Sequence, residues 1–383
     1  MHALKPHFRR YGIFLTLNPF MKKRISAIIL TLFTVIPAFS QLGGSSTYNF
    51  LKLPNSARIE ALGGATPALF DADLSLGLQN PATYNKGMHN QIQLSFNNYL
   101  ANIGYGFAGY SRTWDKIGSF MGGIQYLNYG DFIRADESGN QLGTFTAHDV
   151  AIYIGYSRSF FDSLLFVGAN FKNIISQYAE YNSYGMALDL GATYVSRNKL
   201  FTAGLVIKNI GGQLDPYTPG NREPIPFEIQ IGVSQAFKHV PLRFFLTATN
   251  LQRPDLSYYD RDNRFVQDPL TGDSIDTKLN VGLNILRHFI IGMEFYPFKK
   301  RVFLRLAYNF QRSGEMSVDA MNGAVGLSYG IGVRISHFTI SYSRAHYFMT
   351  QSPNHFTLNI NLDGFLKAKK KKSEAPPPPP LQP

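Results

Sequence analysis

The chain has 383 residues, of which 14% are aromatic and 16% are charged, and it contains 34 Gly and 22 Tyr. This composition is typical of an all-β chain and unlike that of a soluble α/β enzyme. Because there is no Cys, a disulfide framework, a Cys-based zinc site and a Cys nucleophile are excluded.

The formal net charge of +12 comes mainly from the two ends of the chain. Residues 1–40 carry six basic residues and no acidic one, and the tail from Lys367 adds five Lys against Glu374. Residues 41–363 hold 26 basic and 24 acidic side chains, a net of +2. A nucleic-acid binder is expected to carry its basic stripe in the folded part, so this distribution argues against that class.

A secretory leader is predicted over residues 21–40. Met21 is followed by the basic run Lys22–Arg24, an apolar stretch from Ile25 to Ile36, and the small-residue pattern Ala38-Phe39-Ser40. We expect cleavage before Gln41, and we interpret residues 1–20 as a mis-called upstream extension. The apolar stretch is short for a membrane anchor, and no later stretch approaches the roughly 18 apolar residues of a membrane-spanning helix.

From Gln91 to Asp363, segments of alternating apolar and polar residues are separated by turn residues. A soluble sandwich also alternates, but here the strands are long and numerous. Charges recur on the Gly-, Ser-, Thr- and Asn-rich polar face: Asp189, Glu228, Arg243, Glu294, Arg305 and Arg334. In a membrane barrel the apolar face turns outward to lipid and the polar face inward. The pattern therefore predicts an all-β fold, a transmembrane antiparallel β-barrel.

Fourteen strands are predicted, at 91–97, 103–113, 118–130, 148–160, 164–174, 183–195, 200–210, 226–237, 242–251, 288–297, 301–311, 323–335, 338–347 and 355–363. The short connections between them are typical of periplasmic turns, and the longer ones of outer loops. The expected outer loops are 98–102, which is short, and 131–147, 175–182, 211–225, 252–287, 312–322 and 348–354. The alternating segment 278–286 would make fifteen strands, but its Leu spacing favours a short helix within the long loop. The even count places the C-terminus in the periplasm.

Two glycine motifs match enzyme signatures. Residues 104–109 (GYGFAG) have the spacing of a dinucleotide-binding loop, and residues 326–330 (GLSYG) that of a nucleophile elbow around Ser328. Both signatures need a helix directly after a strand, whereas both stretches here lie inside alternating segments. We interpret them as barrel glycines.

Residues 41–90 do not alternate. The sequence SARIEALGGA (56–65) predicts a short helix broken by Gly63 and Gly64, and Asn80-Pro81-Ala82 predicts a turn. We expect this segment to fold into the lumen as a hatch or plug, with an ordered periplasmic arm as the alternative. Charges inside a barrel need partners or water, so we expect a plugged interior. The predicted organisation is 1–20 extension, 21–40 signal peptide, 41–90 hatch, 91–363 barrel and 364–383 periplasmic tail.

A hatch with Asn-Pro-Ala followed by fourteen strands resembles the FadL-like outer-membrane family. The stretch GGSSTYNFLKLPNSARIEALGGA from Gly43 resembles the PorV/PorQ family of the type IX secretion system, and PorQ-type members most. The sequences LRHFIIGMEFYP (286–297), LRLAYNFQRSGEM (304–316) and HFTLNINL (355–362) add to this resemblance. Only structural hatch positions are carried over: Gly63, Gly64, Asn80, Pro81 and Ala82.

The resemblance implies a non-enzymatic barrel of an attachment complex that links cargo to lipopolysaccharide. There it would anchor a PorZ-like surface protein, beside a PorU-like sortase and a PorV-like barrel. It implies no catalytic residue, cofactor or metal. The alternative is a FadL-type channel for hydrophobic small molecules. An outer-membrane enzyme is a third class, for which the sequence offers no catalytic constellation.

The loop 252–277 is rich in Asp and also carries Tyr258, Tyr259 and Phe265. Its acidic spacing does not fit a calcium loop, since Arg264 stands where an oxygen ligand is needed and the required Gly is missing. Exposed aromatic residues beside charge suit a protein interface, so we expect the partner to dock here. The Lys- and Pro-rich tail, 364–383, is expected to be dispensable, although Lys369–Lys372 suit contact with anionic lipid head groups.

Overall fold

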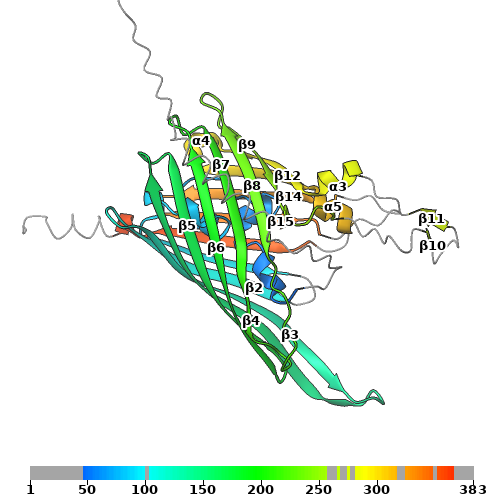
Figure 1. Cartoon of the computed structure of the whole chain (residues 1–383). Coiled ribbons are helices and arrows are strands. Elements are labelled where there is room, and N and C mark those ends of the chain that lie inside the picture. Colours follow the sequence, from blue (N-terminus) through cyan, green and yellow to red (C-terminus); the bar gives the residue numbers. More distant parts are fainter. Residues whose placement is uncertain are drawn as a thin grey trace, which may run out of the picture. The chain divides into compact units, whose positions relative to one another are not determined.

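The structure is a computed structural model that describes residues 46–99, 103–256, 265–267, 274–276, 281–316, 324–347 and 352–365. It confirms the predicted fold, a closed antiparallel barrel of fourteen strands (Figure 1). The barrel strands are β1 (Gln91–Asn98), β2 (Gly104–Trp114), β3 (Gly118–Ala135), β4 (Gln141–Phe160), β5 (Leu165–Tyr178), β6 (Tyr181–Val195), β7 (Phe201–Asp215), β8 (Glu228–Ala236), β9 (Leu242–Ala248), β12 (Phe289–Phe295), β13 (Val302–Asn309), β14 (Leu327–Ile335), β15 (Phe338–Ala345) and β16 (Asn354–Asn361). A separate two-stranded sheet joins β10 (Phe265–Gln267) to β11 (Ser274–Asp276).

The first strand closes the barrel because it pairs with both β2 and β16. Ile92 lies opposite Ile360 of β16 on one side and opposite Tyr110 of β2 on the other. In the strand order every barrel strand has two neighbours. Closure in this way removes the unpaired strand edges that a hydrocarbon environment would penalise.

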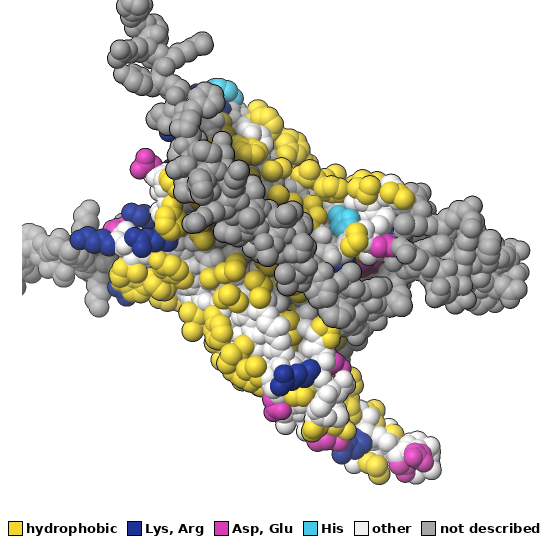
Figure 2. All heavy atoms as spheres, viewed as in Figure 1, with side chains coloured by type: hydrophobic (Ala, Val, Ile, Leu, Met, Phe, Trp, Pro, Cys, Tyr) yellow, Lys and Arg dark blue, Asp and Glu magenta, His cyan; other side chains and the backbone are white. Residues whose placement is uncertain are grey.

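The barrel wall is apolar outside and polar inside. On β1, Leu94 and Phe96 are 46% and 58% exposed, whereas Gln93 and Asn97 are completely buried. Hydrophobic side chains cover much of the visible outer wall in Figure 2. This arrangement inverts that of a soluble β-sandwich and is the one expected of a barrel that spans a bilayer.

Five of the six charges predicted for the inner face lie buried or half-buried on it, but Arg334 does not. Arg334 is exposed, and its Nε atom donates to Thr339 Oγ1 at 3.3 Å. The reason is its place near the end of β14, where Ser336 and His337 connect directly to β15. At that position the inner face opens to the surroundings.

Short helices precede the barrel and lie in its connections. The first group is η1 (Asn49–Lys52), α2 (Ala57–Ala61), η2 (Leu74–Leu78), η3 (Pro81–Thr83) and η4 (Lys86–Met88); the second is α3 (Val281–Arg287), α4 (Pro297–Lys300) and α5 (Phe310–Met316). Helix α2 confirms the helix predicted within 56–65, and α3 confirms the one within the long loop. Among the described residues, no helix has the length and apolar character needed to cross a membrane.

Two predicted outer loops are wrong. Residues 131–147 mostly continue β3 and β4 as a ribbon, with Phe132 opposite Phe145, and β5 and β6 are joined by only two residues. The ribbon turns back at residues 136–140, where the Asp136 carboxylate accepts the Ser138 and Asn140 N–H groups at 2.9 and 2.8 Å. We call residues 131–146 the arm; Figure 1 shows β3 and β4 running past the ends of their neighbours.

Residues 104–109 lie inside a strand, as predicted, but Gly326 of the second motif is a turn residue with a φ of +92° directly before β14, so the predicted strand 323–335 begins too early. Residues 104–109 belong to β2 and pair with β1 and β3, and Ser328 of β14 pairs with Ala345 and Ala307. Neither stretch therefore has the strand-to-helix geometry that its enzyme signature requires.

Candidate functional site

Residues 46–90 fill the inside of the barrel, and we call them the plug. Figure 1 shows them, in blue, behind the strands of the front wall. The Ala57 N–H donates to Thr357 Oγ1 of β16 at 2.8 Å, and the Tyr84 hydroxyl donates to Asn170 Oδ1 of β5 at 3.0 Å. The plug also has an apolar core of fully buried side chains: Ile59, Leu62, Leu69, Leu74 and Leu76. It thus combines a small core with polar contacts to the polar inner wall.

Four of the plug's five short helices, all except η1, begin at side-chain caps. Ser56 Oγ accepts the Ile59 N–H at 3.2 Å, and Asp73 Oδ1 accepts the Ser75 N–H at 3.1 Å. Such caps satisfy N–H groups that the first helical turn leaves without a partner. They suit a segment whose helices are too short to be stable alone.

The Asn-Pro-Ala turn links the plug to β6. Asn80 Oδ1 accepts the Ala82 N–H at 3.0 Å, while its Nδ2 donates to the Pro67 carbonyl at 2.8 Å and to Thr193 Oγ1 at 3.0 Å. The wall leaves room for this turn only because it has glycines there. A Cβ at Gly168 would lie 2.4 Å from the Pro81 carbonyl oxygen.

Gly63 and Gly64 end α2 in a backbone conformation that favours glycine. Their φ angles are +85° and +101°, and a left-handed residue is a common way to end a helix. The Gly63 carbonyl accepts from Asn309 Nδ2 of β13 at 2.9 Å. A Cβ at Gly63 would lie 2.5 Å from Ile290 Cγ2, so close approach to the wall also requires glycine here.

A buried ion-pair cluster joins the plug to three wall strands. Arg58 of the plug lies 2.7 Å from Asp71 and 2.9 Å from Glu294 of β12. Arg243 of β9 lies 3.0 Å from Asp71, and Arg305 of β13 lies 3.2 Å from Glu294. Asp73 completes the cluster, 3.2 Å from Arg58. Three guanidiniums and three carboxylates thus neutralise one another, as buried charges require. We call this set the lock.

Asp71 keeps its charge within the lock. Burial alone would raise the pKa of its carboxyl group, but the nearby Arg58 and Arg243 guanidiniums outweigh burial and hold that pKa below its usual range. The plug carboxylate therefore stays ionised at neutral pH and balances the two guanidiniums.

Other charges inside the barrel are also paired. Glu60 of α2 lies 3.7 Å from Arg312 of α5, whose guanidinium carbon is 4.0 Å from the centre of the Tyr347 ring. On the wall, Lys172 of β5 lies 2.8 Å from Asp189 of β6. These pairs fit the predicted plugged interior.

The structure places the five predicted hatch positions against the wall. Most of the predicted docking loop, however, lies outside the described residues. Tyr258 and Tyr259 lie outside the described residues; for Phe265 the structure describes the backbone of β10 alone. That docking surface stays a prediction. In the described parts of the chain, no group of three His, Asp or Glu side chains is placed to hold a metal ion.

Sequence reasoning missed the plug half of the lock. Arg58, Asp71 and Asp73 stand in a segment without periodicity, so no pattern sets them apart. The wall half was visible as charges on the polar faces of strands at Arg243, Glu294 and Arg305. A matching charge elsewhere in the chain was the only available signal.

The fold and the lock define a class: a barrel with an apolar outer wall and, inside it, a segment that precedes the first strand and is held to the wall by ion pairs. No protein-family model and no curated protein matches the chain. Similar solved structures include the Pseudomonas putida toluene transporter TodX, at 13% identity over 80% of this chain and 96% of that chain, with a TM-score of 0.45. Another is a Pseudomonas aeruginosa FadL homologue, at 11% identity over 80% and 98%, also with a TM-score of 0.45. These scores are below 0.5, so the fold assignment depends on the chain's own strand order.

Proposed function

We propose that this protein is a non-enzymatic barrel of the bacterial outer membrane that is closed by its plug and acts as an anchor. The observation that carries the proposal is the lock, because it fixes the plug to the wall by ion pairs in which Arg58 and Glu294 are buried and Arg243 and Asp71 are partly buried. The outward apolar wall supports the membrane location. A barrel closed in this way is suited to holding other proteins at the membrane.

The orientation follows from the lengths of the connections. All six connections at the end of the barrel that holds the start of β1 and the end of β16 are short, whereas the opposite end has short connections and also the long ones at 216–227, 249–288 and 310–326. We call the end with only short connections the short-turn end, and we call the opposite end the long-loop end. Short turns are typical of the periplasmic side of outer-membrane barrels. We therefore propose that the C-terminus is periplasmic.

Within this class, we propose a place in a type IX secretion and attachment complex. The sequence resemblance to the PorV/PorQ family supports this role, with a PorZ-like surface protein as the anchored partner and a PorU-like sortase and a PorV-like barrel as neighbours. The long-loop end offers apolar surface for such contacts. On α3, Val281, Leu283 and Ile285 are each more than half exposed, and exposed apolar side chains next to polar loops suit a protein interface.

The arm is a second feature that suits a partner protein. Its strands pair with each other, while described pairing with β2 ends at Asn128 and with β5 at Ala147. One face carries the stacked rings of Phe132 and Phe145, 5.2 Å apart, with the Arg134 guanidinium 5.9 Å from the Phe145 ring. Unpaired strand edges are places where another chain can add a strand.

A channel for hydrophobic small molecules is the second candidate. The similar solved structures are named as a toluene transporter and a FadL homologue, and these names agree with the channel candidate rather than with the secretion role. Because both TM-scores are below 0.5, the names do not decide between the two candidates. A channel would require the plug to move or a path to open beside it, and the lock opposes movement of the plug.

Loss of the gene separates the two candidates. The anchor role predicts that secreted proteins carrying a C-terminal sorting domain are no longer retained at the cell surface, while uptake of lipophilic nutrients is unchanged. The channel role predicts the reverse.

Affinity purification of the tagged full chain from native membranes provides an independent readout. Co-elution of a surface protein with the wild type, and its loss with a Tyr258→Ser, Tyr259→Ser variant, would support docking at the loop; unchanged co-elution would remove that loop from the account.

A further inference from the structure

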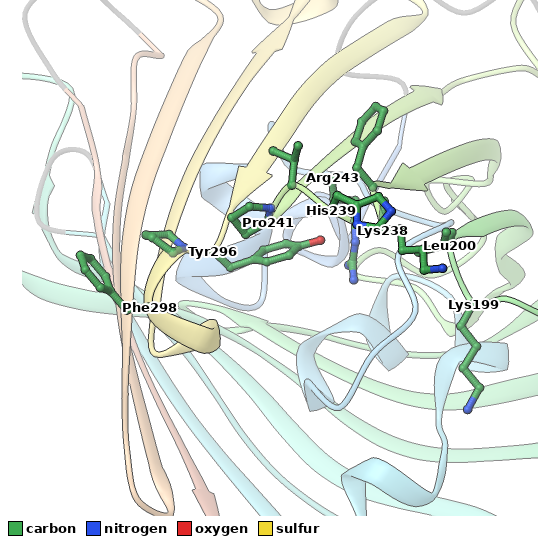
Figure 3. A pocket seen from close by; sticks show the side chains of 12 residues that line it. Lys199, Leu200, Lys238, His239, Pro241, Arg243, Tyr296 and Phe298 are labelled. Atoms are coloured by element: carbon green, nitrogen blue, oxygen red, sulfur yellow. The ribbon is translucent and has the colours of Figure 1, made fainter.

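A pocket of about 490 Å³ opens at the short-turn end of the barrel, next to the lock, which contributes Arg243 to its lining. Its walls come from the β6–β7 turn, the β8–β9 turn and the segment that leads into α4 (Figure 3). Backbone hydrogen bonds hold these segments together: the Ala236 N–H donates to the Leu200 carbonyl at 2.7 Å, and the Tyr296 N–H donates to the Pro241 carbonyl at 2.8 Å. The volume lies within the range of small-molecule sites.

The polar lining of this pocket is positively charged. It includes Lys199, Lys238 and Arg243, together with His239, and contains no Asp or Glu. Arg243 is already neutralised by Asp71 and Glu294 of the lock. Lys199 and Lys238 differ, because they are exposed and form no ion pair with any residue that the structure describes. The two lysines therefore leave an unbalanced positive charge beside the pocket.

The rim of the pocket is apolar and continues the outer wall. Phe298 and Val240 are 74% and 50% exposed, and the exposed Phe237 ring packs edge-on against Phe244 of β9, with ring centroids 6.0 Å apart. In Figure 3, Tyr296 lies between Phe298 on one side and Leu200 and Lys199 on the other. Cationic side chains next to lipid-facing apolar ones are typical of the boundary between hydrocarbon and head groups.

We propose that this pocket binds a phosphate group, with Lys199 and Lys238 as its charge partners and His239 as an additional hydrogen-bond donor or acceptor. The apolar rim fits a phosphate carried by an acyl chain, as in an anionic phospholipid. Free inorganic phosphate has the same anionic chemistry without the chain. The proposal is independent of the anchor function, since it concerns the barrel's turns and not its partners.

The test compares binding to the full-length protein and a Lys199→Gln, Lys238→Gln variant. Lys116→Gln is the matched control, because Lys116 is an exposed lysine in the β2–β3 turn and does not line the pocket. One arm measures retention of phosphatidylglycerol and of phosphatidylcholine by native mass spectrometry in detergent. The other measures binding of inorganic phosphate by calorimetry.

We expect the double variant to bind phosphatidylglycerol about twenty-five-fold more weakly than the wild type, since each of the two lysines near a lipid surface contributes roughly a factor of five. The control should bind as the wild type does. If the wild type binds inorganic phosphate and the double variant does not, the site is supported and free phosphate is its ligand. Equal retention of the two lipids together with no phosphate binding would overturn it, as would binding that the double variant leaves unchanged. Circular dichroism of the variant establishes that the barrel remains folded.

Discussion

Arg58 of the plug and Glu294 of β12 lie 2.9 Å apart, with side chains 7% and 2% exposed, although 236 residues separate them in the chain. This contact ties helix α2 of the plug to the barrel wall near the short-turn end of β12.

Removing Arg58 should loosen the plug. Breaking one side of a buried ion pair leaves uncompensated charge and typically costs ~3–5 kcal/mol. We expect Arg58→Ala to lower the thermal unfolding temperature of the purified barrel and to produce channel openings in planar bilayers. Lys86→Ala is the control, because the Lys86–Asp115 pair is fully exposed and such pairs contribute little. Equal behaviour of the two variants would contradict the importance of the lock.

The close approach of the plug to β5 predicts that Gly168→Ala is destabilising. The added Cβ would meet two backbone atoms, the Pro81 oxygen at 2.4 Å and the Ala82 nitrogen at 2.7 Å, neither of which can rotate away. Overpacking of this kind costs ~1–3 kcal/mol or more. Gly122→Ala is the control, since nothing lies within 4 Å of a Cβ at Gly122. Thermal unfolding in detergent compares them; a stable Gly168→Ala protein would show that the turn does not contact β5 as described.

The lock should resist mild acid. Asp71 has a folded-state pKa below its usual value, so its contribution to stability is present above the unfolded pKa of about 4 and is lost only as the pH falls through the folded pKa. The stability gap between the wild type and Asp71→Asn should therefore be constant from neutral pH to about pH 5 and should shrink only below about pH 4. Unfolding curves over this range measure it. A stability difference between the wild type and Asp71→Asn that disappears near pH 6 would mean that a group other than Asp71 holds the plug in place.

The arm should be removable without loss of the barrel. Apart from the Ala179 N–H bond to the Thr146 carbonyl and the exposed Arg134–Glu180 pair, the described contacts of its backbone and charges are internal. Replacing residues 131–146 with Asn-Gly should shift the unfolding temperature by no more than a few degrees, because an isolated two-stranded ribbon contributes little stability. If the arm holds a partner, co-purification should fall while the fold is kept. An unfolded product would show that the arm supports the wall.

The sequence predicted the wall because strand alternation is a local signal. Leu94 and Phe96 alternate with Gln93 and Asn97 within one short segment, so their faces could be assigned without knowing any neighbour. The outward direction of the apolar face was inferred from the predicted leader and from the charged polar faces. The positive φ of Gly63 and Gly64 was likewise visible as a helix break.

The strand ends and the lock could not be predicted in this way. In the arm, Phe132 of β3 lies opposite Phe145 of β4 across a turn. The sequence of this stretch predicts a loop instead, because it contains Gly, Asp and Ser residues that are typical of turns. The pairing of Arg58 with Glu294 depends on the register of every strand between them. No feature near Arg58 distinguishes it from an exposed arginine.

Planar-bilayer recording of the purified full-length protein tests the central claim most directly. If the plug closes the lumen as the lock indicates, the inserted wild-type barrel should show no sustained conductance, and a variant lacking residues 46–90 should show large, steady openings. Sustained high conductance from the wild type would contradict the account.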